Sequence, residues 1–143
     1  MDGQQRAGEV HGVECATGGE RVVVPSAVID QIVEVEISPL PLAPPFVLGV
    51  AVRDDELVLA VSIAGNPAPP AGGLTKAVLL TDRGIPMRVA VAIDEVISFV
   101  RASVRDDHGR AWTRPASTSD GREVSWVDVE RLGLVLSAVG DAQ

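Results

Sequence analysis

Short aliphatic runs closed by glycine or proline dominate this sequence and limit what it can fold into. Three successive valines at residues 22–24 end at Pro25, and the aliphatic run 58–63 leads into a stretch rich in Gly and Pro. The chain has 14 Gly and 10 Pro among 143 residues, but no Tyr and only two Phe and two Trp. Because strands favour β-branched side chains and because Gly and Pro mark strand ends, we expect a mainly β protein with an aliphatic core.

Three pairs of these runs are predicted to form β-hairpins. They are residues 13–17 with 20–24, residues 46–52 with 56–63, and residues 76–81 with 87–93. The first pair turns at Gly18-Gly19 and the third at Asp82-Arg83-Gly84, where glycine supplies the positive φ of a tight turn. The apolar pattern then continues as a strand from Ile93 to Val104.

Other segments have a less decided pattern. Residues 26–35 place apolar side chains at helical spacing, which fits one or two helical turns or an irregular strand. Four prolines between Pro39 and Pro45 predict a rigid extended connector. The polar segment from Arg105 to Gly121 is predicted to be a long loop, and such loops often carry function.

One amphipathic helix is predicted near the end of the chain, over residues 127–139. Its apolar side chains recur at intervals of three and four, which is the helical period. Ser125 and Asp128 approximate a capping box at its start, and Gly140 stands where a glycine commonly ends a helix.

The length and the charge predict one soluble domain in the cytoplasm. We expect a disordered tail at residues 1–12 and a single domain of two lobes at residues 13–143. Twenty acidic against 12 basic residues give a net charge of −8, which argues against nucleic-acid binding. The apolar runs fall short of the ~20 residues that a membrane-spanning helix needs. With one cysteine, Cys15, the chain has no internal disulfide, which suits a reducing compartment.

The sequence offers few groups for chemistry. His108 lies beside Asp106 and Asp107, and we interpret this stretch as a solvated turn. Asp54, Asp55 and Glu56 are interpreted as a charged hairpin tip, because neighbouring strand residues point to opposite faces. Cys15 is interpreted as a half-buried structural thiol. We therefore expect no enzyme, no metal and no cofactor, and favour a binding or scaffolding module.

Three blocks of sequence, in order along the chain, resemble the CheW family of coupling proteins in bacterial chemosensory arrays. The first is the run from Gly19 to Pro25 with Ile32-Val33-Glu34-Val35, similar to the family's opening hairpin and V-x-E-V segment. The second is Pro44-Pro45-Phe46-Val47-Leu48-Gly49-Val50, similar to the family's A-P-x-x-x-x-G-V. The third is Val91 to Val96 together with Asp120-Gly121-Arg122 and Val127 to Leu132. The set runs from about Val13 to Leu136.

The resemblance implies a specific fold and set of partners. The fold would be two small SH3-like five-stranded β-barrels that share an aliphatic core, with a short C-terminal helix. Members bind the cytoplasmic tip of a methyl-accepting chemoreceptor in a groove between the barrels, and bind the regulatory domain of a histidine kinase or another CheW-like protein. By this analogy, the receptor-binding residues would be Ile32, Glu34, Val35 and Gly49. The same residues could instead serve the core and strand packing.

The sequence departs from the family where the central strand usually continues as N-x-R-G and then V-P-V-x-D-L. Val52 replaces the Asn, Asp54 the Arg, Asp55 the Gly, and Ser62 the later Asp. A carboxylate cannot make the contacts of a guanidinium. We therefore expect an atypical adaptor that binds a chemoreceptor, is recruited to receptor arrays and couples weakly or not at all to the kinase.

Two competing functions remain open at this point. A small enzymatic or ligand-binding β-barrel would use the loop 105–121 and collect His108 with Asp106 or Asp107 in a concave pocket. An SH3-like module for proline-rich peptides would need an aromatic-lined groove, and this chain is poor in aromatic residues.

Overall fold

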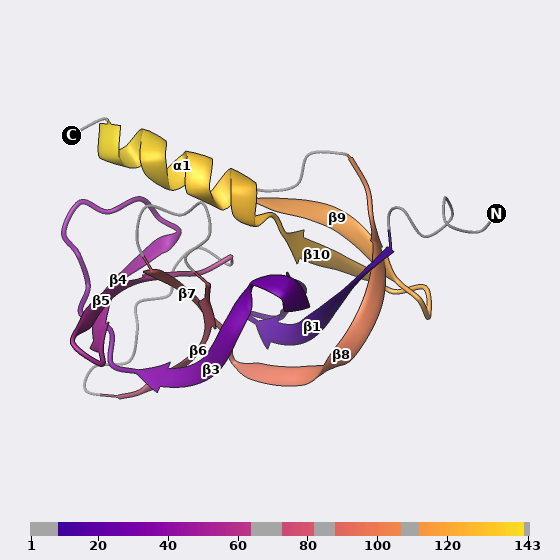
Figure 1. Ribbon diagram of the computed structural model, residues 1–143, viewed down its shortest axis with the longest axis horizontal. Coiled ribbons are helices and arrows are strands. Elements are labelled where there is room, and N and C mark those ends of the chain that lie inside the picture. Colours follow the sequence, from indigo (N-terminus) through magenta and orange to yellow (C-terminus); the bar gives the residue numbers. More distant parts are fainter. Residues whose placement is uncertain (1–8, 64–72, 82–87, 107–111, 142–143) are drawn as a thin grey trace.

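A computed structural model describes residues 9–63, 73–81, 88–106 and 112–141 (Figure 1). Ten strands and one helix follow one another in the described part of the chain. They are β1 (Glu9–Thr17), β2 (Glu20–Pro25), β3 (Ile29–Val35), β4 (Val47–Arg53), β5 (Glu56–Val61), β6 (Thr75–Leu80), β7 (Arg88–Ala92), β8 (Glu95–Val104), β9 (Thr113–Thr118), β10 (Glu123–Val127) and α1 (Val129–Asp141). A 3-10 helix, Ser26–Val28, links β2 to β3.

The strands form two lobes of five strands each, as the family resemblance implies. Lobe 1 is a closed barrel in the order β1-β2-β10-β9-β8, and lobe 2 is a sheet in the order β3-β6-β7-β5-β4. Lobe 2 curls until Ser38, just after β3, exchanges two backbone hydrogen bonds with Val50 of β4, at 2.7 and 2.9 Å. This bridge brings the two edges of the sheet together.

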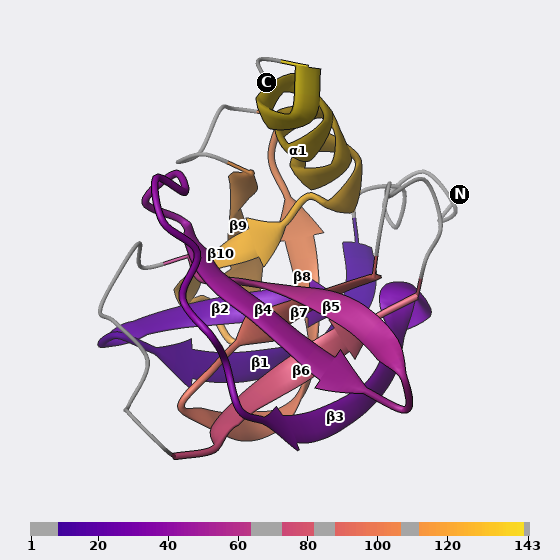
Figure 2. The same cartoon turned by 90° about the vertical axis from the view of Figure 1, so that its left-hand side faces the viewer.

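An aliphatic core joins the lobes. Strands β1 and β2 contribute four buried side chains, lobe 2 and Ile93 contribute eight, and Trp112, Val127, Leu132 and Leu136 complete the cluster. Helix α1 extends from β10 across to lobe 2, so its buried leucines pack against both halves (Figures 1 and 2). Each lobe also has its own smaller cluster of buried residues. The shared core confirms the prediction of two lobes packed on aliphatic side chains.

The predicted hairpins β1–β2, β4–β5 and β6–β7 are present, with antiparallel pairing in each. Residues 64–72 and 82–87, which include the predicted turn Asp82-Arg83-Gly84, lie outside the described residues. The segment 26–35 becomes one 3-10 turn followed by strand, because β3 gains a full antiparallel ladder with β6.

Three expectations about segment ends were wrong. The strand β1 begins at Glu9 and pairs with β8 from that residue, so the predicted tail cannot extend to residue 12; residues 1–8 lie outside the described part. The predicted loop 105–121 contains β9, which is held between β8 and β10. The helix cap is Asp128 and not Ser125, which lies in β10; Asp128 accepts a hydrogen bond from the Arg131 amide at 3.1 Å.

The tip of the β4–β5 hairpin is a two-residue turn made by Asp54 and Asp55. Their φ angles are 53° and 65°, and Arg53 pairs with Glu56 across the turn. Positive φ at both central residues is the type I′ geometry, which suits the twist of the flanking strands and favours Asn and Gly. Asp54 and Asp55 therefore adopt a left-handed backbone conformation, which costs free energy for any residue other than glycine.

Helix α1 has only 13 residues, and no helix among the described residues has the length and apolar character to cross a bilayer.

Candidate protein-binding groove

Strand β8 carries exposed apolar side chains beside an open strand edge. Phe99 is 82% exposed, and Val96 and Ile97 are each 38% exposed. On one side β8 pairs with β1 from Glu95 to Ser103. On the other side β9 pairs with β8 only over 102–104, so in the described chain the outer edge has no strand partner before Ala102.

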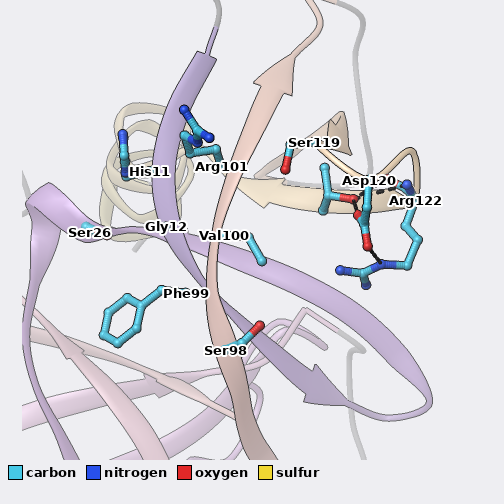
Figure 3. Close-up of a pocket in the computed structure, with 11 residues that line it drawn as sticks. His11, Gly12, Ser26, Ser98, Phe99, Val100, Arg101, Ser119, Asp120 and Arg122 are labelled. Atoms are coloured by element: carbon cyan, nitrogen blue, oxygen red, sulfur yellow. Dashed lines mark hydrogen bonds and ion pairs between the residues drawn. The ribbon is translucent and has the colours of Figure 1, made fainter.

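Phe99 stands at the junction between the lobes. Its cross-strand partner on β1 is Val13, which belongs to the shared core. Because such partners share a face of the sheet, Phe99 extends the apolar surface of that core into solvent. In Figure 3 its ring points away from the β9–β10 turn that carries Arg122, on the side where Ser26 begins the 3-10 helix.

A concavity of about 460 Å³ follows this part of β8. Phe99 and Ser26 line it near the junction of the lobes, and His11 and Arg101 line it further along the β1–β8 ladder (Figure 3). Thr118, Ser119, Asp120 and Arg122, around the β9–β10 turn, form the opposite wall. We call this surface the β8 groove. It is open and shallow, with an apolar end at Phe99 and a polar wall at the turn.

A charge network fixes the polar wall. The carboxylate of Glu14 is fully buried and accepts two hydrogen bonds from Arg122, at 2.6 and 2.9 Å, and one from Arg21 at 3.0 Å. Arg122 also donates to Asp120, which in turn accepts a hydrogen bond from Thr118. The hydrogen bonds from Arg122 lower the pKa of Glu14 and outweigh the effect of burial. The pKa of Arg122 is raised by the same contacts.

The residues predicted to bind a receptor are spread over lobe 2. Ile32 is 43% exposed and Glu34 is exposed, and both lie on the same face of β3. Neither lines the β8 groove. Val35 is buried in the core of lobe 2, so its side chain is not available to a partner.

Gly49 is needed for close backbone approach, but the approach is to this chain's own connector. A Cβ at Gly49 would lie 2.1 Å from the backbone oxygen of Ser38, the residue that bridges to β4. Gly49 therefore has a structural role in lobe 2. This role is the alternative to receptor binding that the sequence left open for this residue.

The positions that depart from the family pattern fall into two groups. Val52 is 70% exposed on β4, beside its cross-strand partner Leu57, which is 52% exposed. Asp54 and Asp55 are exposed at the hairpin tip. Ser62, in contrast, is 4% exposed, and its amide donates to the Phe46 backbone oxygen. Ser62 is therefore part of the interior rather than of a partner surface.

Of the site considered for a small enzyme, the structure describes only Asp106. Asp106 is fully exposed and lies 3.7 Å from Arg114, while Asp107 and His108 lie outside the described residues. Within the described ranges, no group of three His, Cys, Asp or Glu side chains could hold a metal ion. Cys15 is fully buried, where half burial was expected, and burial raises its pKa to about 11.

The sequence interpretation missed the β8 groove. It placed the apolar residues 96–100 in a strand and took them as part of the fold. The available signal was the run Val96-Ile97-Ser98-Phe99-Val100, which has apolar side chains on both faces of one strand. The outer face of a barrel strand either packs against the other lobe, as in β2, or faces solvent or a partner, so the pattern marked β8 as a candidate partner surface.

Comparison with known proteins identifies relatives of the whole domain. The sequence profile of the CheW-like domain matches residues 11–134. Among solved structures, the scaffolding protein TtCheW from Thermoanaerobacter tengcongensis superposes with a TM-score of 0.62 at 13% identity, covering 82% of this chain and 88% of that one. A search of curated proteins by sequence found no match.

Proposed function

Because this chain belongs to the CheW-like domain family, we propose that it is a non-enzymatic adaptor that binds the cytoplasmic helical tip of a methyl-accepting chemoreceptor. It would act in the cytoplasm, recruited to receptor arrays. The observation that carries the proposal is Phe99, an aromatic side chain left 82% exposed at the junction of the lobes. A partner helix laid along β8 would cover Phe99 together with Val96 and Ile97.

The energetics suit such a contact. Burying one large apolar side chain contributes about 1.5–3 kcal/mol, so Phe99 alone can supply roughly a fifth to a third of a micromolar affinity, which corresponds to about 8 kcal/mol. Amphipathic helices commonly bind by laying an apolar face into a groove of this kind. Ile32 and Glu34 extend the proposed surface on β3, with Ile32 as an apolar contact and Glu34 as a charge at the rim.

The test is binding of a soluble chemoreceptor hairpin, fused to a coiled coil and taken from each receptor encoded in the same genome. Phe99→Ser should weaken the measured Kd at least tenfold. Leu134→Ser, which changes a side chain 71% exposed on α1, is the matched control and should change Kd less than twofold. Circular dichroism checks that both variants fold. If Phe99→Ser binds as tightly as the wild type, the groove is not the receptor site.

We also propose that coupling to the histidine kinase is weak or absent. The support comes from Asp54 and Asp55 at the β4–β5 tip, where the family pattern has Arg and Gly. In the described chain neither carboxylate has a hydrogen bond or an ion pair. A partner surface built to receive a guanidinium would meet two unpaired negative charges, which is unfavourable.

A pull-down with the regulatory domain of the cognate kinase tests this second proposal. Wild-type protein should show no binding at micromolar concentration, and the double variant Asp54→Arg, Asp55→Gly should bind measurably better. Glu20→Arg, a charge reversal in lobe 1, controls for a general gain of positive charge. Micromolar or tighter binding by the wild type contradicts the proposal. The same assay with a second CheW-like protein shows whether that partner replaces the kinase.

A further inference from the structure

Two hydrogen-bond donors stand together in the β8 groove, next to Phe99. His11 on β1 and Arg101 on β8 are direct cross-strand partners, and both are exposed. Arg101 follows Phe99 by two residues on the same strand, so the guanidinium and the aromatic ring rise from the same face of β8. Figure 3 shows the side chains of His11 and Arg101 at one end of the groove.

Nothing in the described chain pairs with these two side chains. Within the described residues, the side chains of His11 and Arg101 make no hydrogen bond or ion pair, although the Arg101 backbone oxygen accepts a hydrogen bond from the Ser119 amide at 3.0 Å. The other charged groups of the groove are already paired, since Arg122 binds Glu14 and Asp120. The wall therefore offers Arg101 no free carboxylate.

Carboxylates outnumber basic side chains in this chain, by 20 to 12. A basic side chain on an acidic protein ordinarily finds a carboxylate, as Arg88, Arg105 and Arg114 do here. Two basic groups placed directly opposite each other in a ladder destabilise it when both are charged. Folding does not account for the unpaired Arg101, and a carboxylate from a partner would.

We propose that Arg101, flanked by His11, binds a carboxylate of the docked helix, so that the partner carries an acidic side chain one helical turn from the apolar side chain covering Phe99. The spacing supports this arrangement. Two residues of strand span about 6.6 Å, while side chains three or four residues apart on a helix are separated by about 5–6 Å. A guanidinium can also grip a carboxylate with two parallel hydrogen bonds. This inference rests on the proposed function and specifies its partner.

The experiment uses the same receptor hairpins and compares three variants. Arg101→Gln should weaken Kd at least tenfold and Arg101→Glu still more. Arg53→Gln, which removes the same charge at the far end of β4, should change Kd less than twofold. Wild-type affinity should fall as NaCl is raised, and Arg101→Gln should lose most of that dependence, because salt screens the pair.

A charge swap identifies the partner residue. Each acidic side chain of the hairpin is changed to Lys in turn, and one such change should restore binding to Arg101→Glu while weakening binding to the wild type. If Arg101→Glu binds like the wild type although Phe99→Ser does not, the carboxylate site is refuted and the groove survives. If the wild type binds no hairpin, or if Phe99→Ser has no effect, the receptor proposal fails and the inference fails with it.

Discussion

The substitution Glu14→Gln tests how much the ion pairs of Glu14 with Arg122 and Arg21 stabilise lobe 1. The side chain is fully buried, pairs across the ladder with Val23 of the lobe 1 core, and accepts hydrogen bonds from Arg122 and Arg21. The amide of Gln keeps the size of the carboxyl but removes the charge. It also turns one acceptor into a donor that faces two guanidinium groups.

The expected loss follows from the exposure of the partners. Breaking a buried ion pair costs about 3–5 kcal/mol, mostly because a charge stays buried and unpaired. Here the arginines are 43% and 48% exposed, so water compensates them in part. We therefore expect Glu14→Gln to lower the free energy of unfolding by about 2–3 kcal/mol, which is at or just below the lower end of that range. For a chain of this size the melting temperature should fall by about 5–10 °C.

The pH dependence gives a second readout. The pKa of Glu14 is lowered in the folded protein by Arg122 and Arg21, from an ordinary value of 4.5. Its ionised form thus adds stability above the pKa of the unfolded chain, and this stability is lost as the pH falls through the folded pKa. The gap in stability between wild type and Glu14→Gln should be full near neutral pH and should shrink below about pH 4.5.

Urea unfolding followed by the fluorescence of Trp112 and Trp126 measures these differences. Glu123→Gln is the matched control, because Glu123 pairs with Arg105 but is 68% exposed, and it should cost far less stability than Glu14→Gln. A loss at Glu14 no larger than at Glu123, or one that does not change between neutral and acid pH, would refute the account of the network.

Three further outcomes follow from local geometry. Asp55→Gly should raise stability by about 1 kcal/mol in urea unfolding, because φ is 65° there; no gain would show that Asp55 bears no conformational cost. Gly49→Ala should lower stability by at least about 2 kcal/mol, because its Cβ would lie 2.1 Å from the backbone oxygen of Ser38. Gly121→Ala should cost only about 1 kcal/mol, because its φ is 90° but no atom lies near its Cβ position. Cys15 should resist a thiol reagent at pH 8 until the protein unfolds, since its pKa is raised to about 11; rapid labelling in native buffer would contradict its burial.

The hairpins were predictable because their signals are local. Gly18-Gly19 and the alternating runs beside it determine a turn and two strands without help from the rest of the chain. Strand β9 was not predictable, because Thr113-Arg114-Pro115-Ala116-Ser117-Thr118 is polar and contains a proline. It is a strand only because β8 and β10 lie on either side to receive it, and that requirement of the barrel appears nowhere in the local pattern.

The groove was hidden for a related reason. An apolar residue in a strand is ordinarily interpreted as core, and the sequence alone gives no reason to treat Phe99 differently. Only the strand pairing shows that β9 does not pair with β8 before Ala102. Arg101 gave even less signal, since a single arginine in a strand suggests nothing until the three-dimensional neighbours are known to lack a free carboxylate. The family resemblance predicted contacts at Ile32, Glu34, Val35 and Gly49; of these, Val35 is buried in lobe 2 and Gly49 lies against the connector, while Ile32 and Glu34 are exposed.

The order of the strands has a consequence for how the chain acquires its structure. All five strands of lobe 2 are consecutive in the sequence, whereas lobe 1 is built from β1 and β2 at one end and β8, β9 and β10 at the other. During synthesis, the β1–β2 hairpin therefore leaves the ribosome before lobe 2. Val22 and Val24 stay exposed to solvent until the lobe 2 residues that pack against them have been made. We expect lobe 2 to fold first and lobe 1 to close last, with the slow step set by this long-range pairing.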